Sequence, residues 1–153
     1  MDNAGADKLD PMALALREAR AAAMAGEVPV GAVVVRNGAV IAAAHNRPRA
    51  LNDPTAHAEV LAIRRACEVL QDERLTGCDL YVSLEPCAMC AAAISFARIR
   101  RLYFGAPDTK GGAVENGPRL FTQPTCHHAP EVYGGIREGE AAALLREFFA
   151  GRR

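Results

Sequence analysis

The chain of 153 residues is 50% hydrophobic, enough to bury one core, so we expect a single domain over residues 1–153 with residues 1–10 flexible. No apolar run is long enough to cross a bilayer, and the odd number of cysteines, five, does not fit a secreted disulfide scaffold, which favours a cytoplasmic protein without a membrane segment. The 18 basic and 18 acidic side chains cancel, which excludes a general attraction for polyanions, so any nucleic-acid binding must be local.

The first third of the chain predicts a helix followed by a β-hairpin. Residues 12–25 are rich in alanine and leucine, which is typical of a helix. Residues 28–36 are rich in valine, and residues 39–44 resume the apolar pattern. Asn37 and Gly38 between them form the dipeptide most typical of a two-residue hairpin turn. We therefore expect two antiparallel strands after the first helix.

The middle of the chain predicts a loop, a helix, a strand and a second helix. Residues 45–55 have the proline and asparagine content of a loop, and we expect Thr55 to cap a helix over residues 56–70. Residues 79–84 are expected to form a short apolar strand. The alanine-rich residues 87–98 follow as a helix with a proline at its entry.

The last third predicts two strands separated by a long loop, and then a closing helix. Residues 101–104 are expected to form a strand ended by Gly105, and residues 106–130 are rich in glycine and proline. A short strand over residues 132–136 and an amphipathic helix over residues 138–149 follow. This order predicts an α/β fold: a mixed sheet of about five strands with helices on both faces, which is a three-layer α/β/α sandwich.

Two short motifs at predicted helix starts indicate a metal site. They are H-A-E at residues 57–59 and P-C-A-M-C at residues 86–90. Cys87 and Cys90 are three residues apart, so on a helix both thiolates lie on one face and can reach one ion with bonds of about 2.3 Å. His57 would be the third ligand. Thiolates with an imidazole favour Zn²⁺, one ion per chain.

The open fourth position of such a zinc site favours catalysis over a structural role. Three protein ligands leave room for a water, whose pKa zinc lowers to roughly 7. Glu59 lies two residues beyond His57 and could take the proton of that water and pass it to a leaving amine. The alternative is a closed structural site whose fourth ligand comes from Cys126, His127 or His128. Residues 67 and 78, both cysteines, are expected to be small buried apolar residues.

These motifs also carry a family resemblance. H-x-E followed by P-C-x-x-C is the signature of zinc-dependent nucleobase deaminases. The chain resembles the bacterial tRNA adenosine deaminases, within the zinc-dependent cytidine/deoxycytidylate deaminase superfamily, over nearly its whole length. The matching segments are residues 27–32, 53–59, 84–90, 104–113 and 148–149. The resemblance implies a cytidine-deaminase-like sandwich, a homodimer, and hydrolytic conversion of adenosine to inosine at the wobble position of the anticodon loop of an arginine tRNA.

The resemblance assigns roles residue by residue. It implies that His57, Cys87 and Cys90 hold zinc, that Glu59 shuttles protons, and that Asn46 hydrogen-bonds the flipped base. It further implies pocket walls and RNA-loop contacts for seven residues, which are Val28, Pro29, Leu84, Asp108, Lys110, His128 and Phe149. One position departs from the family: His127 stands where asparagine is usual. Histidine can donate one hydrogen bond but cannot present both ends of an amide.

Two other functions fit the same motifs. A deaminase of free guanine or cytosine would use the same zinc chemistry, and residues 53–65 suit guanine deaminases almost as well. A non-catalytic RNA-binding module that keeps zinc for folding would need the three ligands but not Glu59. Sixteen of the 18 basic residues are arginines, and together with residues 104–113 they favour a large anionic substrate over a free base.

Overall fold

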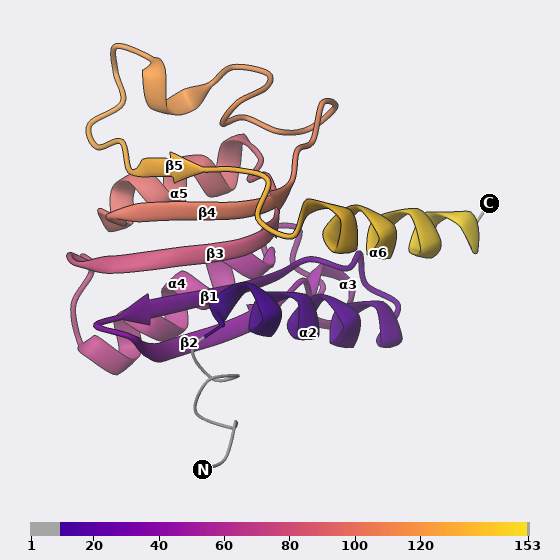
Figure 1. Ribbon diagram of the computed structural model, residues 1–153. Helices are drawn as coiled ribbons and strands as arrows, with labels where there is room; N and C mark the ends of the chain where they lie inside the picture. Colours follow the sequence, from indigo (N-terminus) through magenta and orange to yellow (C-terminus); the bar gives the residue numbers. More distant parts are fainter. Residues whose placement is uncertain (1–9, 153) are drawn as a thin grey trace.

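Five strands form one mixed sheet in the order β2-β1-β3-β4-β5 (Figure 1). In this computed structural model, which describes residues 10–152, β1 pairs antiparallel with both β2 and β3, and β4 pairs parallel with β3 and β5. Nine of the ten residues expected to be flexible, 1–9, lie outside the described residues. The elements are α2 (Pro11–Met24), β1 (Gly31–Arg36), β2 (Ala39–His45), α3 (Pro48–Leu51), α4 (Ala58–Leu70), β3 (Cys78–Leu84), α5 (Ala88–Ala97), β4 (Arg101–Ala106), the 3₁₀ turn η1 (Leu120–Thr122), β5 (Glu131–Tyr133) and α6 (Glu138–Ala150).

Helices cover both faces of the sheet, which confirms the predicted α/β/α sandwich. Helices α2 and α6 lie on one face, and α4 and α5 on the other (Figure 1). Strand β1 shows why its sequence is almost wholly apolar: Val33 and Val35 pack towards α2, while Ala32 and Val34 pack into the core under α4 and α5. A central strand covered on both faces needs apolar residues at successive positions rather than at alternate ones.

Local sequence signals account for the first elements. Asp10 caps α2, its Oδ1 accepting a hydrogen bond from the Ala13 amide at 3.1 Å. The hairpin turn is as predicted, with φ of 51° at Asn37 and 77° at Gly38, the left-handed pair that such a turn requires. Glycine is also needed at Gly31, because a Cβ there would lie 2.0 Å from a carbonyl oxygen of α2.

Three sequence expectations were wrong in detail. Thr55 does not cap a helix: its amide and hydroxyl both donate to Asp53 Oδ1, at 2.8 and 2.7 Å, and the N-cap position of α4 is His57. The predicted loop over residues 45–55 contains the one-turn helix α3. Strand β4 does not end before Gly105 but continues to Ala106, because pairing with Leu84 extends its ladder.

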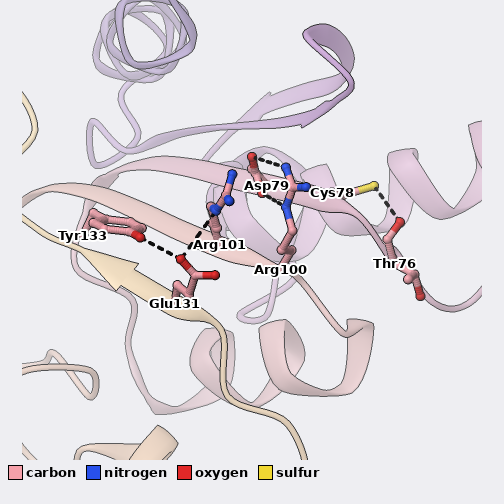
Figure 2. A network of polar contacts seen from close by, with 7 residues as sticks. All are labelled: Thr76, Cys78, Asp79, Arg100, Arg101, Glu131 and Tyr133. Carbon is pink, nitrogen blue, oxygen red and sulfur yellow. Dashed lines mark hydrogen bonds and ion pairs between the residues drawn. The ribbon is translucent and has the colours of Figure 1, made fainter.

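Charged and aromatic side chains join β3, β4 and β5 near the beginnings of these strands (Figure 2). Asp79 accepts two hydrogen bonds from the Arg100 guanidinium, both at 3.0 Å. Arg101 lies 3.5 Å from the carboxylate of Glu131, which also accepts a hydrogen bond from the Tyr133 hydroxyl group at 2.6 Å. The fork-like pairing of Arg100 with the largely buried Asp79 holds the strand registers at the end of the sheet that is remote from the site described below. Among residues 10–152, no helix combines the length and apolar character that crossing a bilayer requires.

Candidate active site

The sheet topology brings four chain segments to one edge. Strand β1 begins where β2 ends, since Gly31 pairs with His45, and it runs antiparallel to β3, whose end therefore lies beside this beginning. Strands β3 and β4 are parallel and finish together, with Leu84 paired to Ala106. The segments entering β1 and leaving β2, β3 and β4 thus converge, as at the carboxyl ends of strands in other open α/β sheets.

His57, Cys87 and Cys90 lie together at this edge, with their ligand atoms all within 4.8 Å of one another. His57 and Cys87 are the N-cap residues of α4 and α5, so the two helices point their positive ends at the same place. His57 Nδ1 is 3.7 Å from Cys87 Sγ and 3.5 Å from Cys90 Sγ. Two ligand atoms on a tetrahedral zinc with Zn–N of ~2.1 Å and Zn–S of ~2.3 Å are about 3.6 Å apart. The donor set therefore fits zinc in type and in spacing.

The pKa values of the two thiols, Cys87 and Cys90, are shifted in opposite directions. A hydrogen bond from Cys90 lowers the pKa of Cys87 to about 4, and a second hydrogen bond, from His57, acts in the same direction. That hydrogen bond to Cys87, together with burial, raises the pKa of Cys90 above its ordinary value. The hydrogen bond with Cys87 also raises the pKa of His57. A lowered pKa favours the thiolate form of Cys87, which is the form that binds a metal ion.

Glu59 is buried in the first turn of α4 and lines the same pocket as His57 and Cys87. Burial raises the pKa of Glu59 to about 7. A carboxyl group that titrates near neutral pH can both accept and release a proton during turnover.

Asn46 follows β2 and connects the pocket to α4. Its Oδ1 accepts a hydrogen bond from the Ala58 amide at 2.8 Å. Because a backbone amide can only donate, this contact fixes the orientation of the carboxamide, and Nδ2 is the group left to face the pocket. One side chain therefore secures the first turn of the ligand helix and offers a donor to a bound molecule.

The pocket has a volume of about 450 Å³, which lies within the range of small-molecule sites and suits a nucleotide-sized group. Of the substrate-binding residues predicted from the sequence, Val28, Asn46, Leu84 and Asp108 line it. The structure does not bring the other four to this wall: among the described residues, Pro29, Lys110, His128 and Phe149 are not part of the lining.

The loop that contains His128 lies against the end of α5. His128 Nε2 is 2.7 Å from the Ile99 carbonyl oxygen, and its amide donates to Ser95 Oγ at 3.3 Å. Cys126 Sγ is 3.6 Å from the same Ser95 Oγ. The structure therefore holds Cys126 and His128 on α5 rather than beside the His57 cluster, and within residues 10–152 no fourth histidine, cysteine or carboxylate ligand joins that cluster.

Sequence reasoning missed several residues of the pocket wall. Glu27 and Glu85 are both buried there, and the Arg49 amide donates a hydrogen bond to Glu27 Oε1 at 3.2 Å. On α6 the lining residue is Phe148, which is 7% exposed, whereas Phe149 is 52% exposed. The Arg152 guanidinium lies 3.7 Å from the centre of the Phe148 ring and also reaches the pocket. The signal available in the sequence was a charged residue inside an apolar segment, as at Glu27 and Glu85.

Comparison with known proteins agrees with this arrangement. The family model for the cytidine and deoxycytidylate deaminase zinc-binding region matches residues 7–106. A tRNA-specific adenosine deaminase of Agrobacterium fabrum is 64% identical over 148 residues, 97% of each chain. A solved structure from studies of A-to-I editing by tRNA:A34 deaminases at the wobble position of transfer RNA is 67% identical, with a TM-score of 0.87 over 88% of this chain and 98% of that one.

A guanine deaminase of Bacillus subtilis is also similar, at 36% identity and a TM-score of 0.64, covering 94% of this chain and 95% of its own. The fold is thus shared with a guanine deaminase, whereas the higher identity is to the tRNA-specific enzymes. On the matched zinc-binding region and the 64% identity over almost the whole chain, the protein belongs to the tRNA-specific adenosine deaminases, a zinc-binding hydrolytic deaminase family.

Proposed function

We propose that this protein converts adenosine to inosine, with release of ammonia, at the wobble position of a tRNA anticodon, the family resemblance indicating an arginine tRNA. One observation carries the proposal: a buried carboxyl group with a pKa of about 7, Glu59, shares a nucleotide-sized pocket with a His-Cys-Cys donor set that fits zinc. The tRNA-specific relatives supply the substrate class.

The reaction replaces the amine on C6 of adenine by a hydroxyl group derived from water. His57, Cys87 and Cys90 would hold the zinc, which when bound lowers the pKa of a water molecule to roughly 7 and polarises it for attack. A carboxylate oxygen of Glu59 accepts the proton of that water. Glu59 passes this proton to ring N1 as the C6–O bond forms. It then takes the proton of the new C6 hydroxyl group and delivers it to the amine, so that the C6–N bond breaks, ammonia leaves and the C6 carbonyl of inosine remains.

Pocket residues orient the base. An adenine buried in a helix stack cannot reach the site, but anticodon loops present unpaired bases at small cost. We infer that Asn46 Nδ2 donates a hydrogen bond to the flipped base and that Val28 and Leu84 contact its faces. Pro29 does not line the pocket, and its contact with the substrate stays a prediction from the family resemblance.

The rim of the pocket supplies groups suited to RNA. Arg49 and Arg152 line the pocket and carry guanidinium groups, which bind phosphate oxygens as a fork. Asp108 also lines the pocket, and we infer that it contacts the RNA loop together with Lys110 of the same segment. Phe149 is half exposed at the end of α6, where an unstacked base could lie against its ring. We also propose that His128, whose loop lies against α5, contacts RNA bound to the partner subunit of a homodimer.

That interface follows from α5, whose sequence is apolar on every side apart from Ser95. A helix without a polar face is normally buried on all sides, yet Phe96 on α5 is 72% exposed. We therefore propose a homodimer that buries this surface. We also place the protein in the cytoplasm, where its tRNA substrate is found and where its five free cysteines stay reduced.

A substrate comparison tests the proposal. Zinc-loaded protein is incubated with an anticodon stem-loop that contains adenosine at the wobble position, and separately with free guanine and free cytosine. We expect inosine and ammonia from the stem-loop only. Ammonia from a free base without inosine in RNA would identify a free-base deaminase instead.

A Glu59→Gln variant tests the chemistry. We expect zinc content and stem-loop binding to be retained while turnover falls by about 10²-fold or more, because glutamine cannot accept and return a proton. Full turnover by Glu59→Gln would refute the role of the carboxylate. Zinc retention without turnover in the parent protein would identify the non-catalytic module.

A further inference from the structure

Glu85 is a charged residue with almost no access to solvent. It follows the last residue of β3 and lies two positions before Cys87, and it is 2% exposed. Its Oε1 accepts hydrogen bonds from the Asp108 amide at 2.9 Å and from Asn116 Nδ2 at 2.7 Å.

The second oxygen of Glu85 accepts three more donors. They are the backbone amides of Val114, Glu115 and Asn116, at 3.1, 2.9 and 3.0 Å. All the donors belong to residues 108–116, which we call the strap. A buried carboxylate is costly unless its oxygens are hydrogen-bonded, and here amide groups of one segment provide that compensation. The hydrogen bonds that compensate the buried charge of Glu85 therefore also hold the strap in place.

The strap fits closely around this carboxylate. A Cβ at Gly112 would lie 2.5 Å from Glu85 Cδ, so a larger residue there would have to displace the carboxylate. The Ala113 amide donates to the Pro86 carbonyl oxygen at 2.9 Å. The strap thus packs on the two residues that lead into the metal-ligand helix.

The strap also fixes Asp108 at the pocket wall. Asp108 Oδ1 accepts the amides of Lys110 and Gly111, at 3.0 and 2.9 Å, and its carbonyl oxygen accepts the Gly112 amide at 3.0 Å. These bonds define a tight turn, but they are internal to the strap. What ties that turn to the rest of the protein at Asp108 is the bond from the Asp108 amide to Glu85.

We infer that Glu85 is a positioning residue for substrate recognition: by binding five strap donors it holds Asp108 at the mouth of the pocket and links the RNA-contacting strap to the segment that carries Cys87. This inference rests on the proposed function, because it assigns the strap a role in binding the RNA loop. The five hydrogen bonds of the Glu85 carboxylate go to the strap, so we assign Glu85 a positioning role and not a catalytic one.

The test variant is Glu85→Gln, which keeps the shape but replaces one acceptor oxygen by a donor group. The remaining oxygen can serve the three backbone amides, and Asn116 can rotate its carboxamide. The Asp108 amide then faces a donor and loses its bond. The matched control is Glu68→Gln, which removes the same charge from an exposed side chain on α4, outside the strap.

Two measurements are made on zinc-loaded protein. Hydrogen exchange without RNA should be faster at the Asp108 amide in Glu85→Gln than in the parent and the control. With the anticodon stem-loop, KM should rise roughly tenfold, as expected for loss of one charge-assisted hydrogen bond, while kcat stays within about twofold and zinc is retained. Unchanged exchange, an unchanged KM, or a fall in kcat alone would each overturn the inference.

A milder variant guards against misfolding. Asn116→Ala removes only the Nδ2 donor, and we expect a KM increase of about two- to threefold in the same assay. If Glu85→Gln does not fold, an unchanged KM for Asn116→Ala overturns the inference. Absence of stem-loop turnover by the parent itself would instead refute the proposed function, and the exchange rate of the Asp108 amide, measured without RNA, would then decide the positioning role alone.

Discussion

Substitutions at Asn46 separate the two roles that its carboxamide performs. Oδ1 accepts the Ala58 amide at 2.8 Å in a buried position, and Nδ2 is left to face the pocket. Asn46→Asp keeps an acceptor at the start of α4, where the helix dipole favours a negative charge, but removes the donor. Asn46→Ala removes both groups.

The expected effects on stability differ. In Asn46→Ala the Ala58 amide loses its partner, and a buried donor without a partner costs about 1–3 kcal/mol. For a domain of this size each kcal/mol lowers Tm by about 2–4 °C, so the loss is measurable by thermal unfolding of the zinc-loaded protein. Asn46→Asp should unfold within about 1 °C of the parent, because its hydrogen bond to the amide is preserved.

Asn46→Ala and Asn46→Asp are expected to lower the activity to a similar extent. Both variants lose the donor to the base, and kcat/KM for the stem-loop should fall by about 10²-fold or more, because a buried polar group of the substrate is left unpaired. Normal kcat/KM in Asn46→Asp would refute the donor role. A Tm of Asn46→Ala equal to that of the parent would refute the role of Oδ1 in securing α4.

Two further predictions concern the core and the sheet. Gly112→Ala should lower the free energy of unfolding by about 1–3 kcal/mol, because the added methyl group meets the Glu85 carboxylate. Gly139→Ala on the open surface of α6 is the control and should cause no such loss. Equal denaturant midpoints for the two variants would contradict the close fit at Gly112. Burial, together with the neighbouring Tyr103 hydroxyl group and the Asp79 carboxylate, raises the pKa of Tyr81 to about 12. The folded state therefore favours neutral Tyr81, and the stability this provides below pH ~10 should be lost as pH rises from ~10 to ~12. Alkaline unfolding followed by tyrosinate absorbance should show this loss in the parent but not in Tyr81→Phe, and identical pH dependence in both proteins would count against it.

The fold and the donor cluster could be predicted because their signals are local. The Asn37-Gly38 turn and the valine-rich strand before it rest on backbone preferences of a few adjacent residues. The spacing of Cys87 and Cys90 rests on the pitch of one helix. In each case the physical cause lies within a few positions of the residues concerned, so one sequence suffices to recognise it.

The support of the site could not be predicted in the same way. Glu85 binds donors that are 23 to 31 residues away, and only the pairing of β3 with β4 brings them together. Phe148 and Phe149 differ by one position on a helix, about 100° of rotation, and the choice between them depends on how α6 docks. Thr55 looked like a cap because its residue type suits one, but Asp53 provides a nearer partner.

The zinc coordination sphere is the most direct test of the central claim, and X-ray absorption at the zinc edge of the purified protein measures it. The claim predicts two sulfur ligands at about 2.3 Å, one nitrogen at about 2.0–2.1 Å and one oxygen that does not come from the protein. Three or more sulfurs, or a second histidine nitrogen, would show a closed structural site and contradict hydrolytic deamination by this protein.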